Sequence, residues 1–311
     1  MAGKFRRYHN RSWLNRLTDW RTLVLNIYDG FRFLVGVLRS IYLLLRIRPD
    51  CIFIKGGFVG LPVGVAAWIL RRPFMTHESD SVPGLTNKIL GRLTPHRVSG
   101  FDIEGYENLG NPVRPEITLP SSYSLEDFGI NSDKPIILAF GGSLGSVSLN
   151  DVVVSFARSN SDYEIIHITG DGASETDDST TNYHAYKFLS DKMPAALQMA
   201  SVVVSRAGAN TLAELATLGK VSIIVPHPSL SGNHQYKNAA VMADSGAVVL
   251  IDQNELTLER FASEVERVSR DEDLRNRLSE NIAKFARQDS AELIADKLLS
   301  IARKKRRGVQ E

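Results

Sequence analysis

The sequence has little of what marks a secreted or membrane-spanning protein. It contains one cysteine, Cys51, which lies in an apolar run and which we expect to be a core residue. One cysteine cannot form a disulfide framework, so a reducing compartment is predicted. The longest apolar stretch, Phe33 to Leu45, is interrupted by Arg39. It falls short of the about 20 residues that span a bilayer, and no small-residue cleavage site follows it.

Metal-ligand clusters and internal repeats are also missing from the sequence. Residues 171–179 contain several acids but no histidine, which is typical of a solvated loop rather than a metal site. We therefore expect neither a metal nor another cofactor. The 311 residues are 43% hydrophobic and 23% charged, which suits an α/β protein of about two domains.

Positive charge is concentrated at the start of the chain. Residues 1–50 hold ten Lys and Arg against three acids, whereas the whole chain has a net charge of +2. Bulky apolar residues alternate with these charges, a mixture expected of interfacial helices. These residues either form amphipathic helices that pack on a sheet or contact an anionic membrane surface, and both can hold on opposite faces. The apolar members are Trp13, Leu14, Trp20, Leu23, Leu25, Ile27, Phe31, Phe33 and Leu34.

Short β-branched runs alternate with helical patterns along the chain. Such alternation predicts parallel sheets with helices on both faces, in two units separated near residues 110–114. The expected helices include Leu61–Leu70, Ala195–Ala200, Thr211–Leu218 and Gln235–Ser245. The expected strands are Cys51–Lys55, Phe74–His77, Pro135–Phe140, Glu164–Ile168, Ser201–Ser205 and Val221–Val225.

A glycine-rich turn follows the first strand of the second unit. Residues 141–146 read Gly-Gly-Ser-Leu-Gly-Ser and lead into a helical pattern from Val147. Glycine lets the backbone approach a phosphate closely, and the N–H groups at a helix start favour an anion. Ser143 adds a hydroxyl donor. Any tight strand-to-helix turn can use glycine as well, so this turn alone does not establish a phosphate site.

Two further strand-to-helix turns carry polar groups. Glu214 follows the turn 206–211, where it either accepts hydrogen bonds from ribose hydroxyls or complements the helix dipole. In the turn 226–238, His234, Gln235 and Asn238 offer the donors and acceptors that sugar hydroxyls need. In open parallel sheets, ligands bind beyond the carboxyl ends of the strands. We therefore expect these three turns to converge on one site.

The motifs of these turns closely resemble those of the MurG family of peptidoglycan N-acetylglucosaminyltransferases. The similar segments include Gly-Gly-Ser-Leu-Gly-Ser at 141–146, Ser-Arg-Ala-Gly-Ala-Asn-Thr-Leu-Ala-Glu at 205–214 and His-Gln-Tyr-Lys-Asn-Ala at 234–239. The resemblance implies an α/β fold of the GT-B type, with two Rossmann-like parallel-sheet domains. It implies an N-terminal acceptor- and membrane-facing domain over 1–113, a UDP-sugar domain over 114–288 and a C-terminal helix over 289–311 that packs back on the first domain.

The resemblance also implies roles for individual residues. On the acceptor side, His77, Glu78 and Asp80 stand in a motif where the family has His-Glu-Gln-Asn, and they are the candidates for the catalytic base. The expected donor-binding residues are Arg114, Gly142 and Ser143 for the diphosphate, Leu189 for the uracil, Ala209, Asn210 and Thr211 for the uridine, Glu214 for the ribose, and His234 and Gln235 for the sugar.

The implied reaction is inverting transfer of N-acetylglucosamine from UDP-GlcNAc to the 4-hydroxyl of N-acetylmuramic acid in an undecaprenyl-diphosphate-linked peptide. The enzyme is expected at the cytoplasmic face of the plasma membrane, held peripherally, without a nucleic-acid partner. The family's N-terminal glycine-rich loop that ends in histidine is missing from this sequence, so we expect an incomplete N-terminal domain. The explanations that stay open are a misassigned start, a second chain that supplies the missing elements, and a noncatalytic UDP-sugar-binding subunit.

Overall fold

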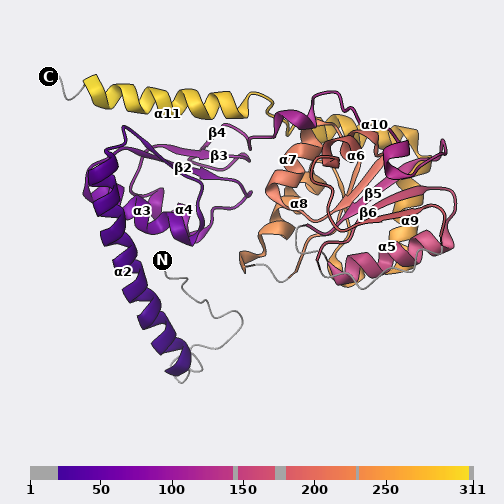
Figure 1. The fold of residues 1–311 in the computed structure, drawn as a ribbon, viewed down its shortest axis with the longest axis horizontal. Coiled ribbons are helices and arrows are strands. Elements are labelled where there is room, and N and C mark those ends of the chain that lie inside the picture. Colours follow the sequence, from indigo (N-terminus) through magenta and orange to yellow (C-terminus); the bar gives the residue numbers. More distant parts are fainter. Residues whose placement is uncertain (1–19, 143–145, 172–179, 229–230, 308–311) are drawn as a thin grey trace. The chain divides into compact units, whose positions relative to one another are not determined.

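The structure is a computed structural model that describes residues 20–142, 146–171, 180–228 and 231–307. The chain divides into two compact units (Figure 1). Unit 1 comprises residues 1–109 and 292–311, and unit 2 comprises residues 110–291.

Unit 1 is built on a four-stranded parallel sheet in the order β1-β2-β3-β4. Its strands are β1 (Ile52–Ile54), β2 (Phe74–Glu78), β3 (Arg97–Ser99) and β4 (Glu107–Asn108). Its helices are α2 (Trp20–Ile47), α3 (Gly57–Ile69), α4 (Leu85–Leu90) and most of α11 (Ser290–Arg307).

Two apolar clusters hold the helices of unit 1 to its sheet. Val37 and Leu44 of α2 pack with Ala66 of α3, Ile54 of β1 and Leu90 of α4. A second cluster joins α11 to the sheet, and its members are Met75, Val98, Leu109, Ile294 and Ile301. The C-terminal helix therefore packs on the sheet of unit 1, as Figure 1 shows.

Unit 2 contains a six-stranded parallel sheet in the order β10-β9-β8-β5-β6-β7. Its strands are β5 (Ile136–Phe140), β6 (Glu164–Ile168), β7 (Tyr183–Tyr186), β8 (Val202–Ser205), β9 (Ser222–Ile224) and β10 (Val249–Leu250). Its helices are α5 (Val147–Ser159), α6 (Met193–Met199), α7 (Ala209–Thr217), α8 (His234–Asp244), α9 (Leu258–Arg270) and α10 (Glu272–Ala283).

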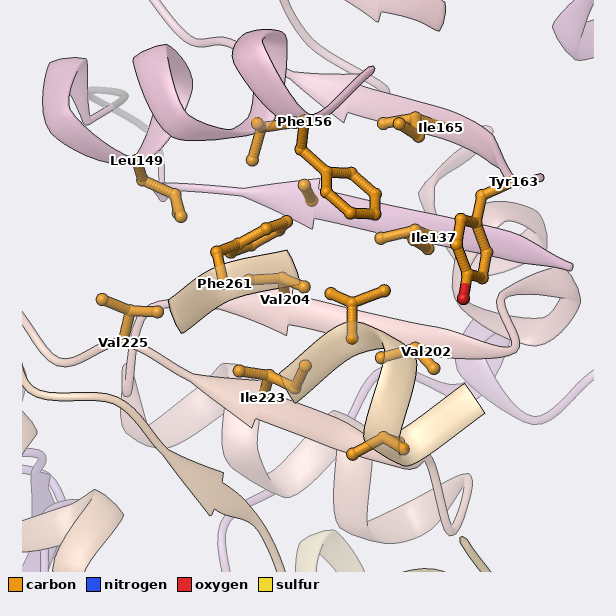
Figure 2. Close-up of a cluster of buried hydrophobic side chains, with 14 of the residues drawn as sticks. Ile137, Leu149, Phe156, Tyr163, Ile165, Val202, Val204, Ile223, Val225 and Phe261 are labelled. Atoms are coloured by element: carbon orange, nitrogen blue, oxygen red, sulfur yellow. The ribbon is translucent and has the colours of Figure 1, made fainter. Parts of the chain in front are cut away.

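The core of unit 2 lies between the sheet and helices α5 and α9 (Figure 2). Phe156 of α5 and Phe261 of α9 meet edge to face with their ring centroids 5.2 Å apart. They cover β-branched side chains of the central strands, among them Ile137 and Val204. Strands β5, β6, β8 and β9 are buried on both faces, which explains why their sequences are largely apolar.

The predicted α/β architecture with two parallel sheets is confirmed. Each of the six predicted strands lies within one residue of its observed ends, whereas β3, β4, β7 and β10 were not predicted. Helix α3 begins at Gly57, four residues before the expected Leu61. The prediction began too late because the glycine-containing first turn has no apolar periodicity. In the described part of the chain, no helix is both long and apolar enough to cross a membrane.

Candidate functional site

Three loops of unit 2 meet at the carboxyl edge of its sheet. They follow β5, β8 and β9, which are neighbours in the sheet, and they lead into α5, α7 and α8. Within the described residues, no side chain caps the start of any of these helices. Their first N–H groups therefore remain available to an anionic ligand. The predicted convergence of the three loops is confirmed by this strand order.

The buried side chain of Arg206 links the three loops by hydrogen bonds. Its guanidinium Nη1 donates to the carbonyl oxygens of Val225 at 2.9 Å and Pro226 at 3.2 Å, and Nη2 donates to the hydroxyl of Ser146. Arg206 directly follows β8, Ser146 precedes α5, and Val225 and Pro226 follow β9. The side chain is 5% exposed, and burial lowers its pKa to about 10, so it remains charged at neutral pH.

Arg114 and Glu214 form an ion pair beside the loop after β8. Nη2 of Arg114 lies 3.4 Å from Oε1 of Glu214, and the Glu214 side chain is the more buried of the two. Burial raises the pKa of the Glu214 carboxyl, and the charge of Arg114 opposes that rise. The pair places Arg114 next to the residue expected to bind the ribose.

Gly142 precedes α5, and the expected uridine residues form the start of α7. Gly142 adopts a φ of +90°, a conformation that favours glycine over other residues. Ser143 lies outside the described residues. Ala209, Asn210 and Thr211 form the first turn of α7, with Asn210 exposed. These positions leave backbone N–H groups at the helix start, as a phosphate or nucleoside ligand requires.

The third loop is held by side-chain contacts of its own. Oε1 of Gln235 accepts a hydrogen bond from the backbone N–H of His227 at 2.9 Å, which directs the amide NH₂ of Gln235 to other partners. A Cβ on Gly232 would lie 2.7 Å from Nε2 of His234, so glycine gives that imidazole room. Asn238 is fully buried and donates to the carbonyl of Ala207. It therefore links two loops, and the prediction that it contacts the sugar is wrong.

Further residues support the edge of the site. Leu189, expected at the uracil, lies between β7 and α6 and is 6% exposed. In the first turn of α5, Nδ2 of Asn150 donates to the carbonyl of Thr169, and its Oδ1 lies 3.1 Å from Nε2 of His167. Nδ1 of His167 lies 2.7 Å from the hydroxyl of Tyr183. Burial lowers the pKa of His167 to about 4, so the ring is neutral and fixes the start of α5.

The three acceptor-side candidates in unit 1 differ in burial. His77 is fully buried, with its ring edge to face with Phe53, and Glu78 is 5% exposed. The Glu78 carboxylate accepts hydrogen bonds from the N–H groups of Asp80 and Gly84, at 3.1 and 2.8 Å. It also accepts one from Nδ2 of Asn87 at 2.8 Å. Glu78 therefore organises the loop, whereas the half-buried Asp80 is accessible from solvent.

Sequence reasoning missed Arg206 and Asn87 as organisers of these two sites. Arg206 stands inside the quoted motif at 205–214, but its partner Val225 follows a different strand. Asn87 lies in α4, and its partner Glu78 ends β2. Neither contact could be predicted from the spacing of residues in the sequence. Among the residues that the structure describes, no group of three His, Cys, Asp or Glu side chains could hold a metal ion.

Comparison with known proteins identifies the family. A model of the glycosyltransferase family 28 C-terminal domain matches residues 136–295, and a model of the family 28 N-terminal domain matches residues 20–97. A relative from Listeria monocytogenes is 36% identical over 293 residues, which cover 89% of this chain and 80% of the relative. It is named "UDP-N-acetylglucosamine--N-acetylmuramyl-(pentapeptide) pyrophosphoryl-undecaprenol N-acetylglucosamine transferase". The chain belongs to the MurG family.

Other MurG relatives agree. One of the same name from Borreliella burgdorferi is 31% identical over 283 residues, covering 88% of this chain and 77% of the relative. The crystal structure of Acinetobacter baumannii MurG superimposes with a TM-score of 0.70 at 27% identity, covering 88% of this chain and 79% of that one. The GT-B fold and the MurG resemblance expected from the sequence are thereby confirmed.

Proposed function

We propose that this chain transfers N-acetylglucosamine from UDP-GlcNAc to the 4-hydroxyl of N-acetylmuramic acid in an undecaprenyl-diphosphate-linked peptide, with inversion at the anomeric carbon. Binding of the donor UDP-GlcNAc is supported by the three loops that Arg206 links at the sheet edge. MurG membership supplies the reaction class. The uncapped helix starts and the positive charges of Arg114 and Arg206 suit the diphosphate, whose negative charge grows as UDP departs.

Within this proposal, different residues bind the ribose, the diphosphate, the uracil and the sugar of UDP-GlcNAc. The Glu214 carboxylate, oriented by Arg114, accepts hydrogen bonds from the ribose hydroxyls. The starts of α5 and α7 take the diphosphate and the nucleoside, with Gly142, Ser143, Ala209, Asn210 and Thr211 next to the ligand. Leu189 lines the uracil. The amide NH₂ of Gln235 and the imidazole of His234 bind sugar hydroxyls, since the Oε1 atom of Gln235 is already used by His227.

Asp80 is the proposed base that takes the proton of the acceptor hydroxyl. A general base must reach the proton that it removes, and of the three candidates the side chains of His77 and Glu78 are buried. Glu78 instead holds the Asp80 backbone through the N–H···Oε1 hydrogen bond of 3.1 Å. Glu78 therefore acts as a positioning residue for Asp80, and His77 remains inside the core beside Phe53.

The proposed location is the cytoplasmic face of the plasma membrane, with α2 of unit 1 against the lipid. One side of this helix exposes an apolar stripe, and Arg32, Arg39 and Arg46 follow its border at seven-residue spacing. Such a pattern suits an interfacial helix on an anionic membrane. The stripe consists of Val24, Ile27, Tyr28, Phe31, Leu34, Leu38, Tyr42 and Leu45, each about half exposed or more.

A comparison of Asp80→Asn with Glu78→Gln tests the assignment of the base. Asp80→Asn should reduce kcat by about 10² or more while the Kd of UDP-GlcNAc stays unchanged, because general-base catalysis contributes about 10²–10⁴-fold. Glu78→Gln keeps the size of the side chain and should lower thermal stability as well as kcat. Equal kcat for Asp80→Asn and the unaltered chain would rule out Asp80 as the base.

A further inference from the structure

A groove of about 470 Å³ lies between α2 and the first half of α3 in unit 1. Leu43 of α2 and Val59, Pro62 and Val63 of α3 give it mainly apolar walls, and Arg39 lines it as well. Its volume is that of a small-molecule site. An apolar groove of this shape suits a slender hydrocarbon chain more than a polar ligand.

The α3 wall of the groove belongs to a helix whose start lies near the acceptor-side residues. Helix α3 starts directly after β1, where Gly56 and Gly57 both have left-handed backbone conformations. A Cβ on Gly56 would lie 2.9 Å from Nδ2 of Asn87, the atom that donates to the Glu78 carboxylate. The first turn of α3 is therefore packed next to the loop that carries Asp80.

The first turn of α3 also exposes apolar side chains. Phe58 and Val59 are 45% and 60% exposed, and Val59 belongs to the groove wall. On α2, Tyr42 lines the groove and is also a member of the exposed stripe. The groove thus shares Val59 with the exposed first turn of α3 and Tyr42 with the stripe of α2 that is proposed to meet the membrane.

We propose that this groove binds the isoprenoid chain of the lipid-linked acceptor, in the part nearest its diphosphate. The inference rests on the proposed function, since it assumes a lipid-linked acceptor at Asp80. The acceptor hydroxyl must reach the enzyme while the far end of its lipid stays in the bilayer. The groove lies between α2, which is proposed to meet the membrane, and α3, whose start lies near the acceptor-side loop. Arg39 places a positive charge beside a ligand whose head group is a diphosphate.

Photo-crosslinking tests the occupant directly. The probe is an undecaprenyl-diphosphate-linked MurNAc-peptide with a photoreactive diazirine on the isoprene units closest to the diphosphate. After irradiation with the full chain in detergent, we expect mass spectrometry to find the crosslinks on residues 36–43 and 58–63. Crosslinks confined to other segments would overturn the proposal.

Kinetics with two exposed apolar residues of α3 provide the second test. Val59→Ser changes the groove wall, and Ile69→Ser is its matched control, since Ile69 is 51% exposed at the other end of the same helix. Val59→Ser should raise KM for the undecaprenyl-linked acceptor about tenfold. It should leave KM unchanged for UDP-GlcNAc and for an acceptor with a methyl group in place of the isoprenoid chain. Ile69→Ser should leave all three KM values unchanged.

The outcomes distinguish failure of the groove proposal from failure of the proposed function. If the unaltered chain transfers sugar to neither acceptor, the proposed function fails. If it transfers to the undecaprenyl-linked acceptor, but Val59→Ser and Ile69→Ser have the same KM for it, the groove does not bind the isoprenoid chain and the proposed function stands. Val63→Trp, which fills the groove with a larger side chain, should act in the same direction as Val59→Ser.

Discussion

Nη2 of Arg114 lies 3.4 Å from Oε1 of Glu214, although 100 residues separate them in the sequence. The Arg114 side chain is mostly exposed, whereas that of Glu214 is 16% exposed. An exposed arginine gains little stability from such a pair. The ion pair matters for function, because Arg114 favours the ionised form of the Glu214 carboxyl, where we expect the ribose hydroxyls to bind.

Replacement of Glu214 should weaken nucleotide binding. Glu214→Ala removes a charged acceptor, so the affinity for UDP measured by calorimetry should fall by about 1.5–3 kcal/mol. Glu255→Ala, which removes an exposed acid elsewhere in unit 2, serves as the control and should leave the affinity unchanged. Equal affinities for the two variants would refute the ribose role of Glu214.

The affinity for UDP should also depend on pH through Glu214. Burial raises the pKa of this carboxyl, and the carboxylate is the form that accepts two hydrogen bonds from the ribose. Binding should therefore weaken as the pH falls, with a midpoint above that of an ordinary glutamate. Arg114→Met removes the opposing charge and should move this midpoint to higher pH. A midpoint that does not respond to Arg114→Met would contradict the coupling.

Arg206 should affect donor binding through the loops that it holds together. Arg206→Met keeps the length of the side chain but loses the hydrogen bonds to Val225, Pro226 and Ser146. Since a hydrogen bond from a charged group contributes about 1.5–3 kcal/mol, we expect at least a tenfold loss in UDP-GlcNAc affinity. Arg206→Lys retains the charge without the planar fork and should rescue binding in part. Native affinity in Arg206→Met would refute this role.

His167 should make the fold sensitive to acid. Its pKa is lowered to about 4 in the folded chain, so the unfolded chain takes up the proton first as the pH falls below the ordinary value of 6.5. The free energy of unfolding should then decrease by up to about 1.4 kcal/mol per pH unit until pH 4. Urea unfolding at pH 7 and pH 5 should show a smaller decrease for His167→Gln. The same decrease in both proteins would exclude His167 as the cause.

The exposed stripe of α2 should control attachment to membranes. Phe31→Ser combined with Leu34→Ser removes two side chains that are 65% and 60% exposed. Co-sedimentation with vesicles that contain anionic lipid should decrease, while the affinity for UDP stays the same. Leu119→Ser removes an equally exposed residue of unit 2 and is the control. Unchanged sedimentation of the double variant would contradict attachment through α2.

Much of the donor site could be predicted from the sequence, because its motifs are local. The turns after β5, β8 and β9 each combine a buried strand, a loop and a helix start within about a dozen residues. What the sequence did not reveal depends on contacts between distant segments. Arg206 reaches Ser146 over 60 residues, and no periodicity indicates that contact.

The acceptor side was less predictable for the same reason. In the sequence, His77, Glu78 and Asp80 were equally good candidates for the catalytic base. In the structure, the first two are buried and Asp80 is accessible. The charge pattern of residues 1–50 left open whether the helix packs on a sheet or meets a membrane. Helix α2 has one face packed on α3 and another exposed, so the packing is established and the membrane contact remains a proposal. The second chain, which the sequence left open as one alternative, is likewise untested.

Transfer to a defined acceptor tests the central claim most directly. The full chain is incubated with UDP-GlcNAc and undecaprenyl-diphosphate-linked MurNAc-pentapeptide, and the product is analysed by mass spectrometry and NMR. The account predicts release of UDP and a new β-1,4-linked N-acetylglucosamine on the 4-hydroxyl of N-acetylmuramic acid. Binding of UDP-GlcNAc without any glycosylated product would contradict it and would leave a noncatalytic UDP-sugar-binding protein.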